Sequence, residues 1–260
     1  MKMTRKLIPA LAMLLVSAIM LSTASFAWFA SNNKVTAQDM TVTVQTTASF
    51  LEISSEETGT YLTYADATNK KYSTTDGKKG LDLVTARLAD AEGADATTTK
   101  KVLTWLVGES GSTSSAKDEN TNTSYRPATV DETTNYALVN SFFVKMSAGS
   151  TADISNLIIT GVEVNELAKN NLKNALRVLV DGPDGIQVWT NTSGEWKPDT
   201  ANSDAVLANT VSKSAVELKV YVYFDGDDTV AYTNNTYDTT GAQQVLGDLE
   251  VTVTFGPQSA

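Results

Sequence analysis

The chain of 260 residues contains no cysteine and no histidine. Without cysteine it can form no disulfide framework, no iron–sulfur cluster and no thiol nucleophile. Without histidine it lacks a Ser-His-Asp triad, an HExxH zinc site and the commonest general base near neutral pH. These absences exclude many classes of enzyme, and we predict a non-enzymatic protein without catalytic residues.

Basic side chains are also scarce, with 20 Lys and Arg against 30 Asp and Glu and a net charge of −10. An acidic surface repels phosphates, so we expect no nucleic-acid partner. The hydrophobic content of 42% is enough to bury a core, which argues against wholesale disorder. The length suits one β-rich domain or two small ones.

The amino terminus has the three parts of a secretory signal. Basic residues among the first six are followed by the apolar run Leu7–Leu21 and then by small residues, with Ser25 and Ala27 at the −3 and −1 positions. We predict a signal peptide over residues 1–27, cut after Ala27. The alternative is an uncleaved anchor, because the 24 residues Leu7–Ala30 could span a bilayer.

Cleavage is favoured because small residues interrupt the apolar run where a peptidase needs them. The mature chain would keep 17 of the 20 basic residues against 30 acidic ones, a net charge of −13. It would be an acidic secreted protein that meets the membrane only through its leader, before cleavage.

The rest of the chain has the composition and periodicity of β-structure. The whole chain has 37 threonines, nearly all of them after the leader and many of them beside Val, Tyr and Phe. Apolar and polar residues alternate most clearly in Met40–Val44, Val216–Val222 and Leu249–Phe255. Further strands are expected at Phe50–Ile53, Thr60–Tyr64, Val102–Val107, Tyr136–Met146, Ile154–Val164, Leu176–Val180 and Ile186–Thr190.

Turn and loop signals complete the predicted architecture. Asp181–Gly185 indicates a hairpin, and Asn165–Ala175 is a weak helical window. The polar stretches 108–134 and 191–214 are expected to be long surface-loop insertions. We therefore predict an N-terminal signal helix followed by one all-β domain over residues 28–260, a jelly-roll or Ig-like β-sandwich with long polar loops.

The acidic turn after the Val216–Val222 strand is a candidate cofactor site. Asp225, Asp227 and Asp228 could supply oxygen ligands to Ca²⁺. The alternative is a tight turn in which the Asp side chains cap their own backbone, and it is favoured because the spacing is not that of an EF-hand. The pair Asp181 and Asp184 has the same two interpretations.

Aromatic residues could form a sugar-binding face or belong to the core. Trp105, Trp189 and Tyr223 stand in apolar runs, which favours the core. Trp196 stands in the polar stretch 191–214 and is the exception.

Several of these segments resemble the TasA/camelysin family of secreted Gram-positive proteins, which are processed by a dedicated signal peptidase of the SipW type. The resemblance is carried first by Leu21–Ala30 and Val35–Val44, a leader that runs into a Thr/Val-rich strand. Ala175–Val180, Val220–Asp228 and Leu249–Phe255 are also similar to segments of that group. The resemblance implies a jelly-roll subunit of an extracellular matrix fibre or pilus-like filament, located in the matrix or at the cell surface.

Such subunits join by strand donation, so the resemblance implies copies of the same chain as partners, with other matrix or cell-wall components. An alternating strand can satisfy an exposed sheet edge while its apolar face is buried. The alternative is that residues 28–44 hold only the domain's own first strand, which needs the same alternation. The residues expected to carry polymerisation are Trp28, Phe29, Val35, Met40, Val42 and Val44.

Two other functions stay open on the sequence. A surface adhesin or carbohydrate-binding module would use the polar loops and Trp196 as its recognition face. A glycosidase that uses two carboxylates is a third hypothesis, although nothing in the sequence selects such a pair.

Overall fold

The computed structural model describes the chain from Lys34 onward, with gaps. The described residues are 34–37, 40–46, 50–69, 81–82, 84–90, 100–109, 116–117, 124–129, 137–166, 174–192, 194–228, 245–246 and 249–258. Apart from a short 3₁₀ stretch at residues 174–175, their regular structure is β-strand, which confirms the all-β prediction.

The first large sheet has six strands and is antiparallel throughout. Side chains of a strand point alternately to its two faces, so Leu138, Phe142 and Val144 of β10 lie buried on one side. The strand order is β14 (Glu195–Pro198), β13 (Ile186–Thr192), β12 (Leu176–Asp181), β16 (Val216–Phe224), β10 (Ala137–Met146) and β3 (Leu51–Ser54).

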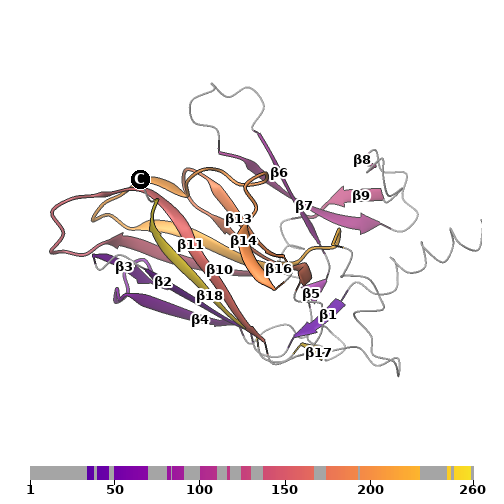
Figure 1. Cartoon of the computed structure of the whole chain (residues 1–260), viewed down its shortest axis with the longest axis horizontal. Coiled ribbons are helices and arrows are strands. Elements are labelled where there is room, and N and C mark those ends of the chain that lie inside the picture. The colour runs from indigo at the N-terminus through magenta and orange to yellow at the C-terminus, as the bar shows by residue number, and fades with distance from the viewer. Residues whose placement is uncertain are drawn as a thin grey trace, which may run out of the picture. The chain divides into compact units, whose positions relative to one another are not determined.

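The second large sheet has five strands and one parallel pair, β2 with β18 (Figure 1). The other neighbours are antiparallel, and a register shift between Ile159 and Gly161 marks a bulge in β11. The strand order is β15 (Ala208–Val211), β11 (Ile154–Glu166), β18 (Leu249–Pro257), β2 (Met40–Thr46) and β4 (Tyr64–Asn69).

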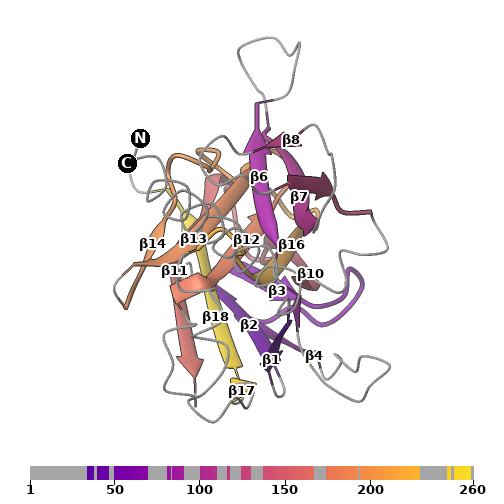
Figure 2. The ribbon, with the colours of Figure 1, turned by 90° about the vertical axis from the view of Figure 1, so that its right-hand side faces the viewer.

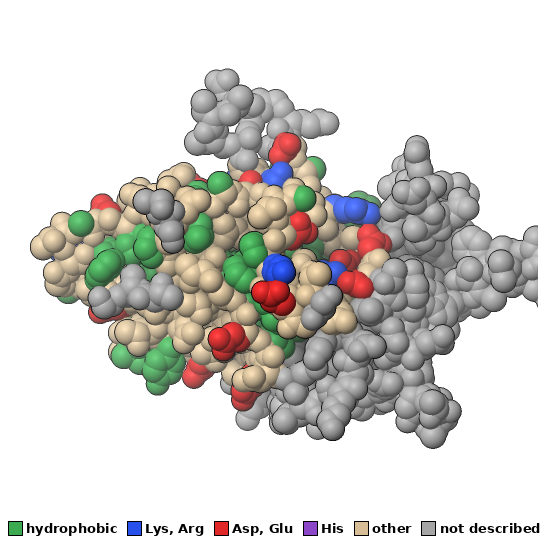
Figure 3. Space-filling model, viewed as in Figure 1, with side chains coloured by type: hydrophobic (Ala, Val, Ile, Leu, Met, Phe, Trp, Pro, Cys, Tyr) green, Lys and Arg blue, Asp and Glu red, His purple; other side chains and the backbone are tan. Residues whose placement is uncertain are grey.

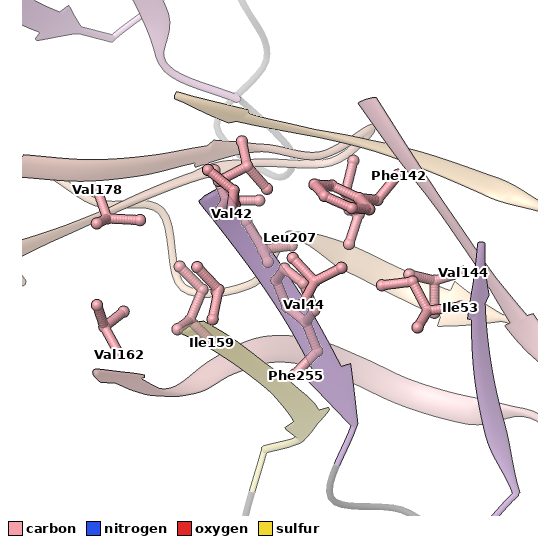
Figure 4. Packing of buried hydrophobic residues seen from close by; sticks show 14 of the residues in the cluster. Val42, Val44, Ile53, Phe142, Val144, Ile159, Val162, Val178, Leu207 and Phe255 are labelled. Carbon is pink, nitrogen blue, oxygen red and sulfur yellow. The ribbon is translucent and has the colours of Figure 1, made fainter. Parts of the chain in front are cut away.

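One hydrophobic cluster draws side chains from both large sheets. In Figure 4, Val42 and Val44 of β2 and Phe255 of β18 lie among side chains of the six-stranded sheet, such as Phe142 and Val144. The chain alternates between the sheets along much of its length, because β2, β4, β11, β15 and β18 lie in one while β3, β10, β12 and β16 lie in the other. The shared core therefore depends on contacts that are distant in sequence.

A second, smaller group of buried side chains lies on the other face of the six-stranded sheet. Leu179 is fully buried although its neighbours Val178 and Val180 point into the main cluster. The hairpin of β6 (Thr85–Ala89) and β7 (Val102–Glu109) covers this face, with Trp105 packed edge-on against Tyr223 at a ring-centroid distance of 5.0 Å. Other buried apolar residues of the larger unit outside the main cluster are Val84, Ala137, Ile186 and Val188.

The remaining strands are short. β1 (Lys34–Ala37) pairs in parallel with β17 (Val245–Leu246) and antiparallel with β5 (Leu81–Asp82). The chain divides into two compact units, one of Lys34–Leu106 with Pro127–Ala260 and one of Met1–Asn33 with Val107–Arg126. In the smaller unit the structure describes residues 107–109, 116–117 and 124–126, including the pairing of β8 (Ala116–Lys117) with β9 (Ser124–Pro127).

Most of the predicted strands are confirmed, with no end more than two residues from its expected position. β2, β3, β7, β10, β11, β12, β13, β16 and β18 correspond to nine of the expected segments. The hairpin at Asp181–Gly185 is also confirmed, since β12 and β13 pair antiparallel and the Gly182 N–H donates to the Gly185 carbonyl at 2.9 Å.

Two local expectations differ from the structure. The strand expected at Thr60–Tyr64 instead begins at Tyr64, and Leu62 forms only an isolated bridge with Ile53. Strand β11 continues through Asn165 and Glu166, the start of the expected helix; residues 167–173 of that window lie outside the described residues.

The stretch 191–214 is not a loop insertion. It contains β14 and β15, and it buries Leu207, Ala208 and Val211 in the main cluster. Burial of these three apolar residues holds the segment against the main cluster. Parts of the stretch 108–134 lie in β7, β8 and β9; residues 128–129 are described outside any strand, and the rest is outside the described residues.

Candidate functional site: the N-terminal strand and the Asp225–Asp228 turn

The predicted polymerisation strand is an interior strand of its own five-stranded sheet. β2 pairs in parallel with β18, from Met40 with Leu249 to Thr46 with Phe255, and antiparallel with β4 on its other edge (Figure 2). Val42 and Val44 are 1% and 0% exposed. In the single chain β2 is therefore one of the domain's own strands, with both of its edges paired.

The other predicted residues of this segment divide between described and undescribed parts of the chain. Val35 lies in β1, where it is the register partner of Leu81. Trp28 and Phe29 lie outside the described residues, as do the predicted cleavage residues Ser25 and Ala27.

On the face away from the core, side-chain hydrogen bonds link β2 to both neighbouring strands. The Gln45 amide donates to the Thr254 hydroxyl of β18 at 3.0 Å. The Thr43 hydroxyl donates to the Asp66 carboxylate of β4 at 2.8 Å. In Figure 3 most of the described surface is backbone and uncharged polar side chains, with hydrophobic patches and scattered charges among them.

The Asp225–Asp228 segment is a tight turn. The Asp228 N–H donates to the Asp225 carbonyl at 3.2 Å, and the Asp227 N–H donates to the Asp225 carboxylate at 3.1 Å. The turn is anchored to two other elements, because the Asp225 N–H donates to the Ala175 carbonyl and the Gly226 N–H to the Val84 carbonyl. This is the capping geometry expected of Asp in turns.

Arginine side chains bind the three carboxylates of this turn. The Arg177 guanidinium lies 3.4 Å from Asp225 and 2.6 Å from Asp228, and it also donates to the carbonyls of Asn174 and Leu176. Arg87 pairs with Asp227 at 3.0 Å. Among the described residues, no group of three or more acidic side chains is arranged to hold a metal ion. The turn interpretation is therefore the one that fits the structure.

Burial raises the pKa of Asp225 above its ordinary value, and the Arg177 charge offsets part of this effect. Burial likewise raises the pKa of Tyr223, which lies beneath the β6–β7 hairpin. The sequence contained a signal for this arrangement that we did not interpret: Arg177 is a lone cation inside the apolar run of β12.

Asp181 and Asp184 have separate roles rather than forming one site. Asp181 pairs with Lys100 at 2.5 Å, while the Asp184 carboxylate accepts from the Asn209 N–H at 2.7 Å. Asp204 accepts from the backbone N–H groups of Lys101 and Ile186. These carboxylates therefore secure backbone segments to one another.

The structure confirms the predicted burial of three aromatic residues and differs from the prediction for a fourth. Trp105, Trp189 and Tyr223 are buried, as their apolar surroundings predict. Trp196 lies in β14, is half-buried and packs against the main cluster, so it is not displayed on a polar loop.

No protein-family model, curated protein or solved structure matches this chain. Within the part of the chain that the structure describes, no helix is long and apolar enough to span a bilayer.

Proposed function

We propose that this protein is a non-enzymatic, secreted structural subunit of an extracellular matrix fibre or pilus-like filament of a Gram-positive bacterium, and that it assembles by β-strand addition. The observation that carries the proposal is the position of β2. It is the first large strand after the leader, it buries Val42 and Val44, and seven of its residues have partners in β18.

A strand with these properties can be exchanged between copies of the chain. If β2 of one copy enters the place between β18 and β4 of the next, it makes the same register pairs and buries the same apolar face. Exchange of an identical element is a low-cost route to assembly, because the neighbour's strand restores the pairing and packing that each copy's own strand gives up. In this proposal residues 28–39 extend the donated strand, with Trp28 and Phe29 at its tip.

Secretion is part of the proposal. The leader of residues 1–27 would be removed after Ala27, which leaves Trp28 as the first residue. Mass spectrometry of the protein from the culture medium should therefore give an N-terminal peptide that begins at Trp28. Recovery of the whole chain in the membrane fraction would indicate an uncleaved anchor instead.

We also propose that the two large sheets form a β-sandwich of the jelly-roll or Ig-like kind. Two features support this: the cluster shared by both sheets, and the repeated crossing of the chain from one sheet to the other. A crystal structure of the secreted protein would test the connectivity. The adhesin hypothesis uses the polar loops and Trp196, and the packing of Trp196 against the core gives it no support.

Filament formation can be tested by supplying the donor strand and the rest of the domain as separate molecules. We would compare a chain that begins at Trp28 with one that begins at residue 47, which lacks β2, and add to the second a synthetic peptide of residues 28–46. The control peptide carries Val42→Asp and Val44→Asp, which would place charges in the main cluster.

The proposal predicts filaments, seen by negative-stain electron microscopy, from the longer chain only. The shorter chain should bind the natural peptide and not the control. A longer chain that stays monomeric at high concentration, or filaments that form without residues 28–46, would contradict the proposal.

A further inference from the structure

Among the described residues, N-terminal and C-terminal strands of the larger unit pair in parallel with the same register. Thr36 of β1 pairs with Val245 of β17, and Thr46 of β2 pairs with Phe255 of β18. The partner numbers differ by 209 at both ends, so the two short strands and the two long ones share the same alignment. Residues 38–39 and 247–248, between them, are not among the described residues.

Because the strands are parallel, the chain enters the pair at one end and leaves it at the opposite end. The chain enters this pair at β1, beside β17, and leaves it after Pro257, beyond the end of β2. A force that pulls the two termini apart therefore acts along the strands and slides β2 past β18. In this direction all seven β2–β18 register pairs must break nearly together, whereas a force across the strands separates them one at a time.

Neighbouring contacts oppose such sliding on every side. β2 is held on its other edge by β4, and β18 on its other edge by β11, so neither is an edge strand. The Gln45–Thr254 hydrogen bond links the two strands on the outer face. On the inner face Val42, Val44, Val251 and Val253 are all buried in the main cluster, so sliding would also move apolar side chains out of a packed core.

We propose that the β1–β2 and β17–β18 segments form a mechanical clamp that resists forces applied between the two ends of the chain. The clamp is a property of the single folded chain. It does not depend on the proposed filament function, although a subunit under tension in a matrix or at a cell surface would benefit from it.

The absence of cysteine makes a direct test possible, because two introduced cysteines give unique attachment points for single-molecule force spectroscopy. In the full chain, Lys34→Cys with Gln258→Cys applies the force along the strands. The matched control, Phe50→Cys with Gln258→Cys, attaches both handles just beyond the same end of the β2–β18 pair, so the force acts across it. Thermal unfolding of both variants checks that their stability is equal.

Rupture in the first geometry should require a force about twofold or more above that in the second at the same pulling rate, because forced unfolding is governed by the barrier along the pulling direction. The clamp predicts this difference at equal thermal stability. Equal forces in the two geometries, or a lower force along the strands, would overturn it.

Discussion

At the scale of single residues, the feature with the clearest energetic consequence is Arg177. Its side chain is 11% exposed, and it neutralises Asp225 and Asp228 while it donates to two backbone carbonyls. Removal of one partner from a buried ion cluster leaves the remaining charges without compensation, which costs more than the pair itself contributes.

Replacement of this arginine should therefore destabilise the protein strongly. We expect Arg177→Met to lower the free energy of unfolding by about 3 kcal/mol, because two largely buried carboxylates lose their cation. The control is Arg87→Met, whose side chain is 50% exposed in its pair with Asp227. We expect that variant to cost less than about 1 kcal/mol, as exposed pairs do. Urea unfolding of both variants measures the difference, and equal effects would contradict this account.

The raised pKa of Asp225 predicts a pH dependence with a definite sign. The folded state holds the Asp225 proton more tightly than the unfolded state, whose value is near the ordinary 3.8. The stability that this group contributes is therefore complete below that value and is lost as the pH rises through the folded pKa. Asn at this position cannot ionise and shows no such loss.

The measurable quantity is the unfolding free energy of the wild type minus that of Asp225→Asn. It should fall as the pH is raised from about 3 toward 7, because the wild type alone must ionise a buried carboxyl. Urea unfolding across that range would measure it. A difference that grows with pH would mean that attraction to Arg177 outweighs the cost of burial.

At the scale of strands and hairpins, close backbone packing explains two glycines. The segment of residues 204–207 crosses the β12–β13 hairpin, with the Asp184 N–H donating to the Leu207 carbonyl at 3.0 Å and the Asp204 N–H to the Ile186 carbonyl at 2.7 Å. A side chain at Gly185 would collide with the Val206 carbonyl oxygen, and one at Gly182 would collide with the Leu207 carbonyl.

We therefore expect Gly185→Ala to destabilise the fold by about 2 kcal/mol, since the added methyl group meets backbone that cannot move freely. Gly149→Ala is the matched control because nothing lies within 4 Å of the added carbon. Its effect should stay within about 0.5 kcal/mol. Thermal unfolding compares the two variants, and a neutral Gly185→Ala would show that the crossing is looser than described.

The small core under the β6–β7 hairpin gives a prediction for that element. Trp105→Ala should cost about 3 kcal/mol, because the indole is buried against Tyr221 and Tyr223. Val102→Ala, on the same strand but 51% exposed, should change stability by less than about 0.5 kcal/mol. Urea unfolding measures both. Similar small effects would mean that the hairpin contributes little to the fold.

Alternation predicts long strands well and short ones poorly. β16 and β18 are nine residues long, and clear alternation over Val216–Val222 and Leu249–Phe255 lets the sequence identify them. β14 and β15 have four residues each within a polar stretch, and no local pattern separates them from a loop. Their positions depend on Trp196, Leu207 and Val211 reaching the main cluster, which is a tertiary effect.

At the scale of the whole molecule, the pairing of strands could not be predicted from the sequence. Nothing local indicates that Met40–Thr46 lies beside Leu249–Pro257, about two hundred residues away, or that the pair is parallel. The same limit applied to the acidic turn, where the alternation predicted the strand before it but not the arginine of another strand that binds it. The donor role of residues 28–44 is consistent with the strand's composition and stays a prediction.

One measurement tests the central claim, that β2 passes from one subunit to the next. Thr43 and Thr252 are register partners, and neighbouring strands lie about 4.8 Å apart, within the range that a disulfide can bridge. We would assemble the mature chain carrying Thr43→Cys and Thr252→Cys under reducing conditions, oxidise it and examine it by denaturing electrophoresis without reductant. Each single-cysteine variant serves as a control. Strand exchange predicts a ladder of covalent oligomers from the double variant only, and a disulfide confined to the monomer band would contradict it.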